Sequence, residues 1–222
     1  MPRLPNTSQN DNNKKAQLIW EQSVGTHRTP VEAYLWTRGI QPPLSEALRF
    51  YDDLIYWDSE NKRELKFPAM VAGISRWPDE KIIAVQRTWL KSDGSGKAPV
   101  EPNKMTLGSM GGAAVQLAPP GHVLGLAEGV ETALTIMQEH KVPTWATLGA
   151  GNFATVKLPP LPLAEAVYIY ADGDAISRDY AREASDLFTR QGRAVWIYSA
   201  PDGVDFNDLL IAYIKRTVEN GK

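Results

Sequence analysis

The second half of the sequence repeats one pattern, a short apolar run that ends at an acidic residue, a glycine or a turn and leads into a polar or helical stretch. The runs occupy residues 122–127, 144–148, 167–171 and 194–199. Short, uniformly apolar runs are typical of strands buried on both faces, and their alternation with helices favours a parallel sheet covered by helices. We therefore predict an α/β domain at 121–222, with functional residues beyond the carboxyl ends of its strands.

The first half of the sequence predicts a different, smaller unit. Two short helices are expected between Lys15 and Arg38, the second beginning at Thr29-Pro30, because threonine caps a helix well and proline suits its first turn. Residues 48–90 contain β-branched and aromatic runs that predict strands. We expect a tail at 1–15 that is too polar to fold, and an α+β subdomain at 16–120 that ends in a long surface loop.

Composition excludes several classes of protein. Of the 222 residues 43% are hydrophobic and 23% charged, and there is no cysteine, so disulfides and cysteine-bound zinc are excluded. No apolar run is long enough for a membrane span, and the first residues lack the apolar core of a secretory signal, so we expect a cytoplasmic protein with no membrane partner. Residues 1–120 hold 15 basic and 13 acidic side chains, and the whole chain has a net charge of −2. Binding to nucleic acid would therefore need a local basic patch in the first half.

Acidic residues follow two of the predicted buried strands. Asp172 and Asp174 flank a glycine directly after 167–171, and Glu128 follows 122–127. Carboxylate oxygens from neighbouring strand ends would suit Mg²⁺. The first pair could equally form a plain turn, and Glu128 alone is better explained as a partner of the following helix dipole.

Other residue types are less informative. Lys97, in a glycine-rich segment without the spacing of a phosphate-binding loop, is either a phosphate contact or a solvated loop lysine. The three histidines are dispersed and show no metal-binding spacing. Most tryptophans stand within apolar runs, so we expect them to pack in the core rather than to stack on bases.

Three segments in the second half together resemble the Toprim domain of DNA primases, topoisomerases and related nucleases, especially the primase-like Toprim proteins of phages, plasmids and integrative elements. They are LAEGVETAL (126–134), YADGDA (170–175) and PDGVDFNDLL (201–210). Upstream, YLWTRGI (34–40), the FPAMVAGISRW and IIAVQRTWL runs and KMTLGS (104–109) resemble the start of a bacterial primase polymerase core. ATLGAGN (146–152) resembles the loop after the second Toprim strand. The resemblance covers roughly residues 30–215.

The resemblance implies roles for particular residues. Glu128, Asp172 and Asp174 would be catalytic and would hold Mg²⁺ or Mn²⁺. Asp205, with Asn207 or Asp208, would form the outer edge of this metal site. The basic residues that would contact nucleotide phosphates or template are Arg87, Lys97 and Lys104.

The activity implied is primase-like synthesis of primers on single-stranded DNA from nucleoside triphosphates, in the replication of a mobile genetic element. A helicase or a zinc-binding replication protein would act in trans, since this sequence has no cysteine. A topoisomerase is set aside because the chain lacks room for a domain carrying a nucleophilic tyrosine. Two alternatives stay open: a metal-dependent Toprim nuclease, in which Glu128 is a ligand or acts as general acid or base, and a non-catalytic accessory subunit.

Overall fold

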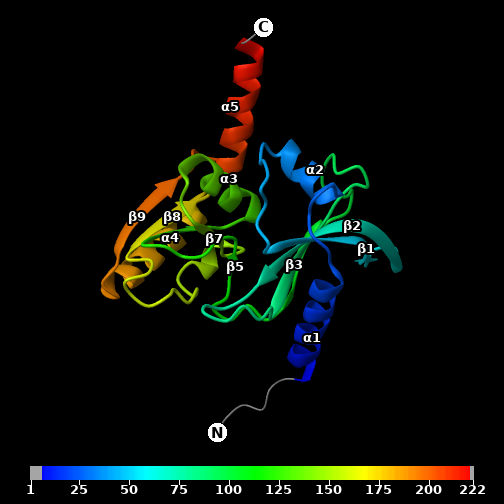
Figure 1. Cartoon of the computed structure of the whole chain (residues 1–222), viewed down its shortest axis with the longest axis horizontal. Coiled ribbons are helices and arrows are strands. Elements are labelled where there is room, and N and C mark those ends of the chain that lie inside the picture. The colour runs from blue at the N-terminus through cyan, green and yellow to red at the C-terminus, as the bar shows by residue number, and fades with distance from the viewer. Residues whose placement is uncertain (1–6, 221–222) are drawn as a thin grey trace. The chain divides into compact units, whose positions relative to one another are not determined.

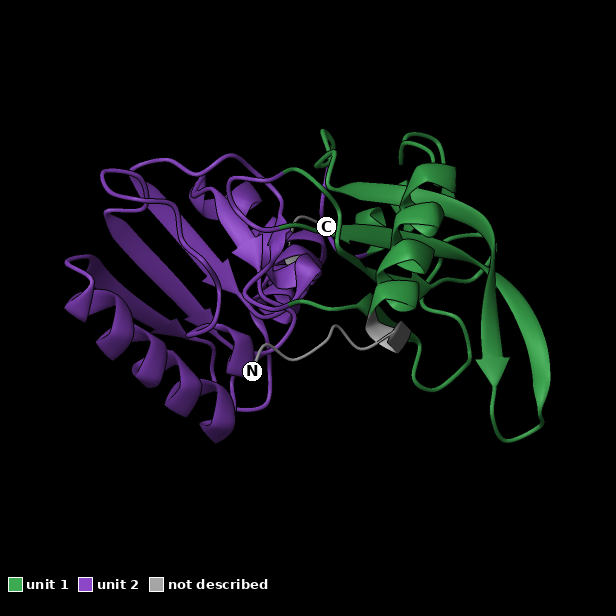
Figure 2. Cartoon of the chain, turned by 90° about the horizontal axis from the view of Figure 1, so that it is seen from below, with its two compact units in different colours: residues 1–37, 42–75, 80–110 green, residues 38–41, 76–79, 111–222 purple. Residues whose placement is uncertain are grey.

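The computed structural model describes residues 7–220, and in it the chain divides into two compact units (Figures 1 and 2). The first comprises residues 1–37, 42–75 and 80–110, and the second comprises 38–41, 76–79 and 111–222. The structure thus places the main boundary at Met110, ten residues before the predicted boundary at 120. The reason is that residues 115–116 form a strand that pairs with Trp145 and Ala146 of the second unit. None of the helices within 7–220 is long and apolar enough to cross a lipid bilayer.

The first unit is an antiparallel sheet in the order β1-β2-β3-β4, with two helices. Its elements are α1 (Thr7–Gln22), α2 (Pro30–Thr37), β1 (Leu48–Asp58), β2 (Arg63–Ile74), β3 (Ala84–Trp89) and β4 (Lys104–Gly108). The predicted start of α2 is confirmed, since Pro30 is its first residue and the Thr29 hydroxyl accepts a hydrogen bond from the Val31 N–H at 3.3 Å. The predicted surface loop before residue 120 is interrupted by β4.

The prediction of an unfolded tail at 1–15 is wrong for residues 7–15, which belong to α1, while residues 1–6 lie outside the described residues. The polar composition of this segment was misleading because the apolar residues that anchor the helix lie in its second half. The first half is held by a polar contact, the hydrogen bond from the Ser109 N–H to Asn13 Oδ1 at 3.0 Å. Ala16 is fully buried, and Ile19 and Trp20 pack with it against Val71 and Val85 of the sheet. A helix held by one apolar stripe can extend polar turns into solvent.

The second unit is a five-stranded sheet in the order β5-β7-β6-β8-β9. Its elements are β5 (Val115–Gln116), β6 (Val123–Ala127), α3 (Val130–His140), β7 (Thr144–Ala146), the 3₁₀-helix η1 (Ala150–Asn152), β8 (Ala166–Ala171), α4 (Ala175–Arg190), β9 (Ala194–Ser199) and α5 (Phe206–Asn220). All pairs are parallel except β5 with β7, which confirms the predicted parallel-rich α/β domain preceded by an α+β unit.

The core of the second unit lies between the sheet and α4. Ala181, Ala184 and Phe188 form the buried stripe of α4, at the spacing of a helix that packs by one face. They contact Val167 and Ile169 of β8 within one hydrophobic cluster. Burial of a side chain such as Phe188 contributes about 1.5–3 kcal/mol, so this stripe fixes the helix that follows the predicted acidic site.

Candidate functional site

The predicted acidic residues do meet at one edge of the second unit's sheet. β6 and β8 pair in parallel, with Leu126 opposite Ile169 and Ala127 opposite Tyr170, so the residues that follow both strands emerge side by side. Asp172 donates its backbone N–H to Glu128 Oε1 at 3.3 Å. Both side chains are half-buried. The fold therefore brings the Glu128 carboxylate to the backbone of Asp172, 44 residues away in the sequence.

The start of α4 holds the other parts of this acidic edge. The Ser177 hydroxyl donates a short hydrogen bond to Glu128 Oε1. Asp174 is the N-cap of α4, and its Oδ1 accepts a hydrogen bond from the Ser177 backbone N–H at 2.8 Å. Because the N-terminus of a helix carries partial positive charge, it stabilises nearby carboxylates. Ser177, which the sequence did not single out, thus links Glu128 to the helix that Asp174 caps.

Gly173 is glycine for a steric reason. A Cβ atom at this position would lie 1.9 Å from the carbonyl oxygen of Pro201 and 2.7 Å from that of Val204. The two loops are also joined by hydrogen bonds from Gly173 N–H to Val204 O at 2.9 Å and from Gly203 N–H to Gly173 O at 2.8 Å. The close approach holds the 172–174 loop against the segment that leads into α5.

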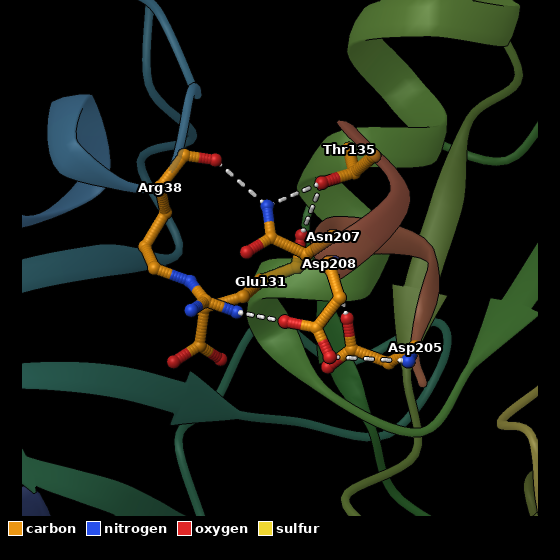
Figure 3. A network of polar contacts seen from close by, with 6 residues as sticks. All are labelled: Arg38, Glu131, Thr135, Asp205, Asn207 and Asp208. Atoms are coloured by element: carbon orange, nitrogen blue, oxygen red, sulfur yellow. Dashed lines mark hydrogen bonds and ion pairs between the residues drawn. The ribbon is translucent and has the colours of Figure 1, made fainter. Parts of the chain in front are cut away.

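The residues predicted for the outer edge of the site form a polar network at the start of α5 (Figure 3). Asp205 Oδ1 accepts from the Asp208 N–H at 2.8 Å, and Asp208 Oδ2 accepts from the Asp205 N–H at 3.3 Å, a reciprocal cap. Asn207 is fully buried and donates to Arg38 O at 2.8 Å and to Thr135 Oγ1 at 2.9 Å. Asp205 and Asn207 therefore hold α5 in place, a role that the sequence did not indicate.

Arg38 also contributes a positive charge to this network. Its Nη2 atom lies 3.4 Å from Asp208 Oδ1, which joins the segment at 38–41 to α5. Glu131, drawn in the same view, is only 6% exposed and lies in the first turn of α3, as expected for an acid near a helix N-terminus.

The donors at the acidic edge fit a divalent cation by their chemistry, since Mg²⁺ and Mn²⁺ prefer carboxylate oxygens. As the side chains stand, however, no three His, Asp or Glu groups within residues 7–220 are close enough together to hold a metal ion. Glu128 and Asp174 instead accept hydrogen bonds from Ser177. A cation at this edge would have to compete with those hydrogen bonds.

A pocket of about 920 Å³ lies within the first unit, between α1 and one face of its sheet. Three cations and one carboxylate line it, together with an amide and three aromatic rings: Lys15, Lys66, Arg87, Asp53, Asn12, Tyr51, Trp57 and Trp89. The Arg87 guanidinium lies 5.0 Å from the Trp89 ring centre, and burial lowers the pKa of Arg87. Its Nε atom is buried and makes no hydrogen bond within the described part of the chain. The pocket therefore places a partly desolvated cation beside aromatic rings.

The structure does not bring the three predicted basic residues together. Arg87 pairs with Met105 across β3 and β4, and both line the pocket. Lys104 pairs with Thr88, so it lies on the opposite face of the sheet and is exposed. Lys97 is half-buried in the loop between these strands, where its backbone pairs with Leu90.

The expectation that most tryptophans pack in the core holds only in part. Trp89 and Trp145 are buried, but three tryptophans are about half exposed or more: Trp36 (62%), Trp57 (55%) and Trp196 (47%). Each of these stands in an apolar run, but one face of its helix or strand is open to solvent. Trp57 and Lys66 of the pocket were missed because only the strand register shows which side chains share a face. Lys15 was missed because it fell in the predicted tail, whereas it belongs to α1.

Two protein families match successive parts of the sequence and together cover most of it. Residues 10–117 match a domain of unknown function (DUF7146). Residues 123–214 match the Toprim family, over the sheet and helices that bring Glu128 next to Asp172. The second unit contains a Toprim domain. No curated protein matches the chain significantly.

Solved structures show that the two units together have the fold of a primase catalytic core. A DNA primase domain from Pseudomonas aeruginosa aligns with a TM-score of 0.58 at 16% identity, over 93% of this chain and 77% of that domain. The zinc-binding and RNA polymerase domains of Aquifex aeolicus primase align with a TM-score of 0.58 at 15% identity, over 99% of this chain and 62% of that one. A DnaG primase catalytic domain bound to single-stranded DNA aligns with a TM-score of 0.57 at 16% identity, over 97% of this chain and 79% of that one. The Toprim domain and the part before it therefore share the architecture of DnaG cores.

Proposed function

We propose that this protein is a Mg²⁺-dependent nucleotidyltransferase that synthesises short primers on single-stranded DNA. The observation that carries the proposal is the contact between Glu128 and the Asp172 backbone at the edge of β6 and β8, in a Toprim domain. The primase-core fold along nearly the whole chain favours synthesis over simple hydrolysis, since a nuclease needs no first unit of this kind.

Glu128, Asp172 and Asp174 would hold Mg²⁺ or Mn²⁺ at this edge, with Asp205 behind them. When bound, the cation supplies charge neutralisation for the triphosphate and the developing leaving group. Ser177 orients Glu128, and the start of α4 favours the negative charge of the site. The tight packing of Gly173 on Pro201 and Val204 fixes the loop that carries two of the three acids.

The pocket of the first unit would bind the nucleic acid. Arg87, Lys15 and Lys66 supply cations for phosphates, and Trp57 supplies an exposed ring for a base, a combination found where proteins bind single strands. Lys104, on the other face of the same sheet, would contact the nucleoside triphosphate. Lys97, in the loop between β3 and β4, is proposed to do the same. With a net charge of −2 over the whole chain, such binding is expected to weaken steeply with salt.

The biological setting proposed is replication of a mobile genetic element in the cytoplasm. Because the sequence contains no cysteine, any cysteine-bound zinc module that reads the template lies outside it. A zinc-binding protein or a helicase acting in trans would supply that function.

One gel assay tests the proposal. The protein is incubated with end-labelled single-stranded DNA, nucleoside triphosphates carrying a second label, and Mg²⁺ or Mn²⁺. We compare it with Asp172→Ala and with Asp186→Ala, a control that removes an exposed aspartate from α4. New labelled oligonucleotides that only Asp172→Ala abolishes support primer synthesis. Shortened template without synthesis indicates the nuclease, and neither product indicates an accessory subunit.

A further inference from the structure

On one face of the Toprim sheet, the aromatic side chains of the last strand, β9, remain exposed. On the face opposite α4, Tyr168 pairs with Trp196 and Tyr170 with Tyr198 across β8 and β9. The rings contact one another, with Tyr170 and Tyr198 stacked at 5.3 Å. Trp196 is nevertheless 47% exposed and Tyr198 43% exposed. Tyr170 of β8 is buried beneath Phe206 of α5 and His140 of α3. Sheets with parallel strands are normally covered on both faces, so the β9 side of this face still lacks a covering element.

The edge of the sheet is equally unprotected. Within the described residues, β9 pairs only with β8 and therefore ends the sheet. Its sequence, AVWIYS, has no charge and no proline, whereas exposed edge strands usually carry such residues to prevent association. The exposed Ile197 on the other side of the strand adds to the apolar surface.

Helix α5 has apolar side chains in its later turns that pack against no surface of the described part of the chain. Its first turns are held by Asn207 and Leu210, which are buried. From residue 212 onward every described side chain is exposed, including Tyr213 at 67% and Val218 at 58%. Figure 1 shows the helix running away from the sheet of its own unit. A helix of this length gains most of its stability from packing, so these last turns call for a partner.

We propose that the chain forms a two-fold dimer in which α5 of each copy covers the β8–β9 aromatic face of the other. A second copy supplies what each feature lacks, a helix for the exposed sheet and a surface for the exposed helix. Two-fold symmetry forms this contact twice, and the strand has no charge that would repel its counterpart. Within one copy only the start of α5 reaches this face, through Phe206 on Tyr170, and Asn207 ties that start to Arg38 and Thr135. This proposal is independent of the proposed activity.

The first test is the molar mass of the full chain by light scattering and sedimentation. We expect a mass about twice the 24.6 kDa of one chain at micromolar concentration. Tyr213→Glu should raise the dimer dissociation constant at least tenfold. The matched control is Ile176→Glu, which introduces the same charge at a residue of α4 that is 68% exposed, and it should leave the constant unchanged. A monomer at 100 µM, roughly the upper limit of a meaningful affinity here, overturns the proposal, as does equal weakening by both variants.

Cross-linking then tests the arrangement, because the chain has no native cysteine. Tyr213→Cys and Trp196→Cys proteins are purified separately, checked for native circular dichroism, mixed and mildly oxidised. A disulfide-linked dimer that forms in the mixture, and not in either variant alone, supports contact of α5 with the β9 of another copy. A dimer that cross-links through Tyr213→Cys alone, or not at all in the mixture, contradicts that arrangement.

Discussion

Replacing Gly173 with alanine should damage the acidic edge without removing any charge. The added Cβ would lie 1.9 Å from Pro201 O, and ordinary contacts between such atoms begin near 3.4 Å. The atoms it meets are backbone carbonyls, so no side chain can rotate away. The two loops must separate by more than about 1 Å, a shift large enough to break both hydrogen bonds between Gly173 and the 203–204 segment.

The cost follows from those two hydrogen bonds. Each contributes about 1 kcal/mol net, so Gly173→Ala should lower the free energy of unfolding by at least about 2 kcal/mol. For a chain of 222 residues that unfolds as one unit, a loss of this size should lower the melting temperature by about 4–8 °C. Thermal unfolding followed by circular dichroism measures the change. Gly121→Ala is the control, because its Cβ would meet nothing closer than Val123 O at 3.7 Å. If Gly173→Ala and Gly121→Ala melt within 1 °C of each other, the steric reasoning is refuted.

Substitutions at three further residues separate structural from functional roles. Asp174→Asn should preserve the α4 cap and weaken only metal binding, whereas Asp174→Ala should also lower the free energy of unfolding by about 1 kcal/mol in urea titrations; equal stability of the two excludes the cap. Asn207→Ala leaves Arg38 O and Thr135 Oγ1 without their donor and should cost about 1–3 kcal/mol by the same measurement; a neutral effect contradicts the network. Trp57→Ala should weaken single-stranded DNA binding by about 1–3 kcal/mol in fluorescence anisotropy with unchanged stability, and unchanged binding removes the ring from the nucleic-acid surface.

The acidic edge could be predicted from sequence because it depends on a local signal. Apolar runs that stop at Glu128 and Asp172 mark strand ends, and parallel pairing brings such ends to one edge. Ser177 could not be found in this way. Its role as the donor to Glu128 depends on the angle at which α4 leaves the strand, and no residue pattern encodes that angle.

Other features could not be predicted because they depend on strand register and on contacts between residues far apart in the sequence. Arg87 and Lys104 were predicted to act together, but the pairing of β3 with β4 sends them to opposite faces of the sheet. Asn207 or Asp208 was expected at the outer edge of the acidic site. The side-chain contacts of Asn207 could not be predicted because they lie with Arg38, 169 residues away, and with Thr135. The beginning of α1 was missed because its anchor, Ala16, follows the polar stretch rather than standing within it.

The central claim is that the acids at the ends of β6 and β8 form a divalent-metal site, and Mn²⁺ binding measured by calorimetry tests it most directly. We predict that the parent protein binds Mn²⁺ and that Asp172→Asn weakens binding at least tenfold, while Asp186→Asn, which alters an exposed aspartate on α4, does not. Both variants should keep the melting temperature of the parent. Equal Mn²⁺ affinity of Asp172→Asn and the parent would contradict the claim.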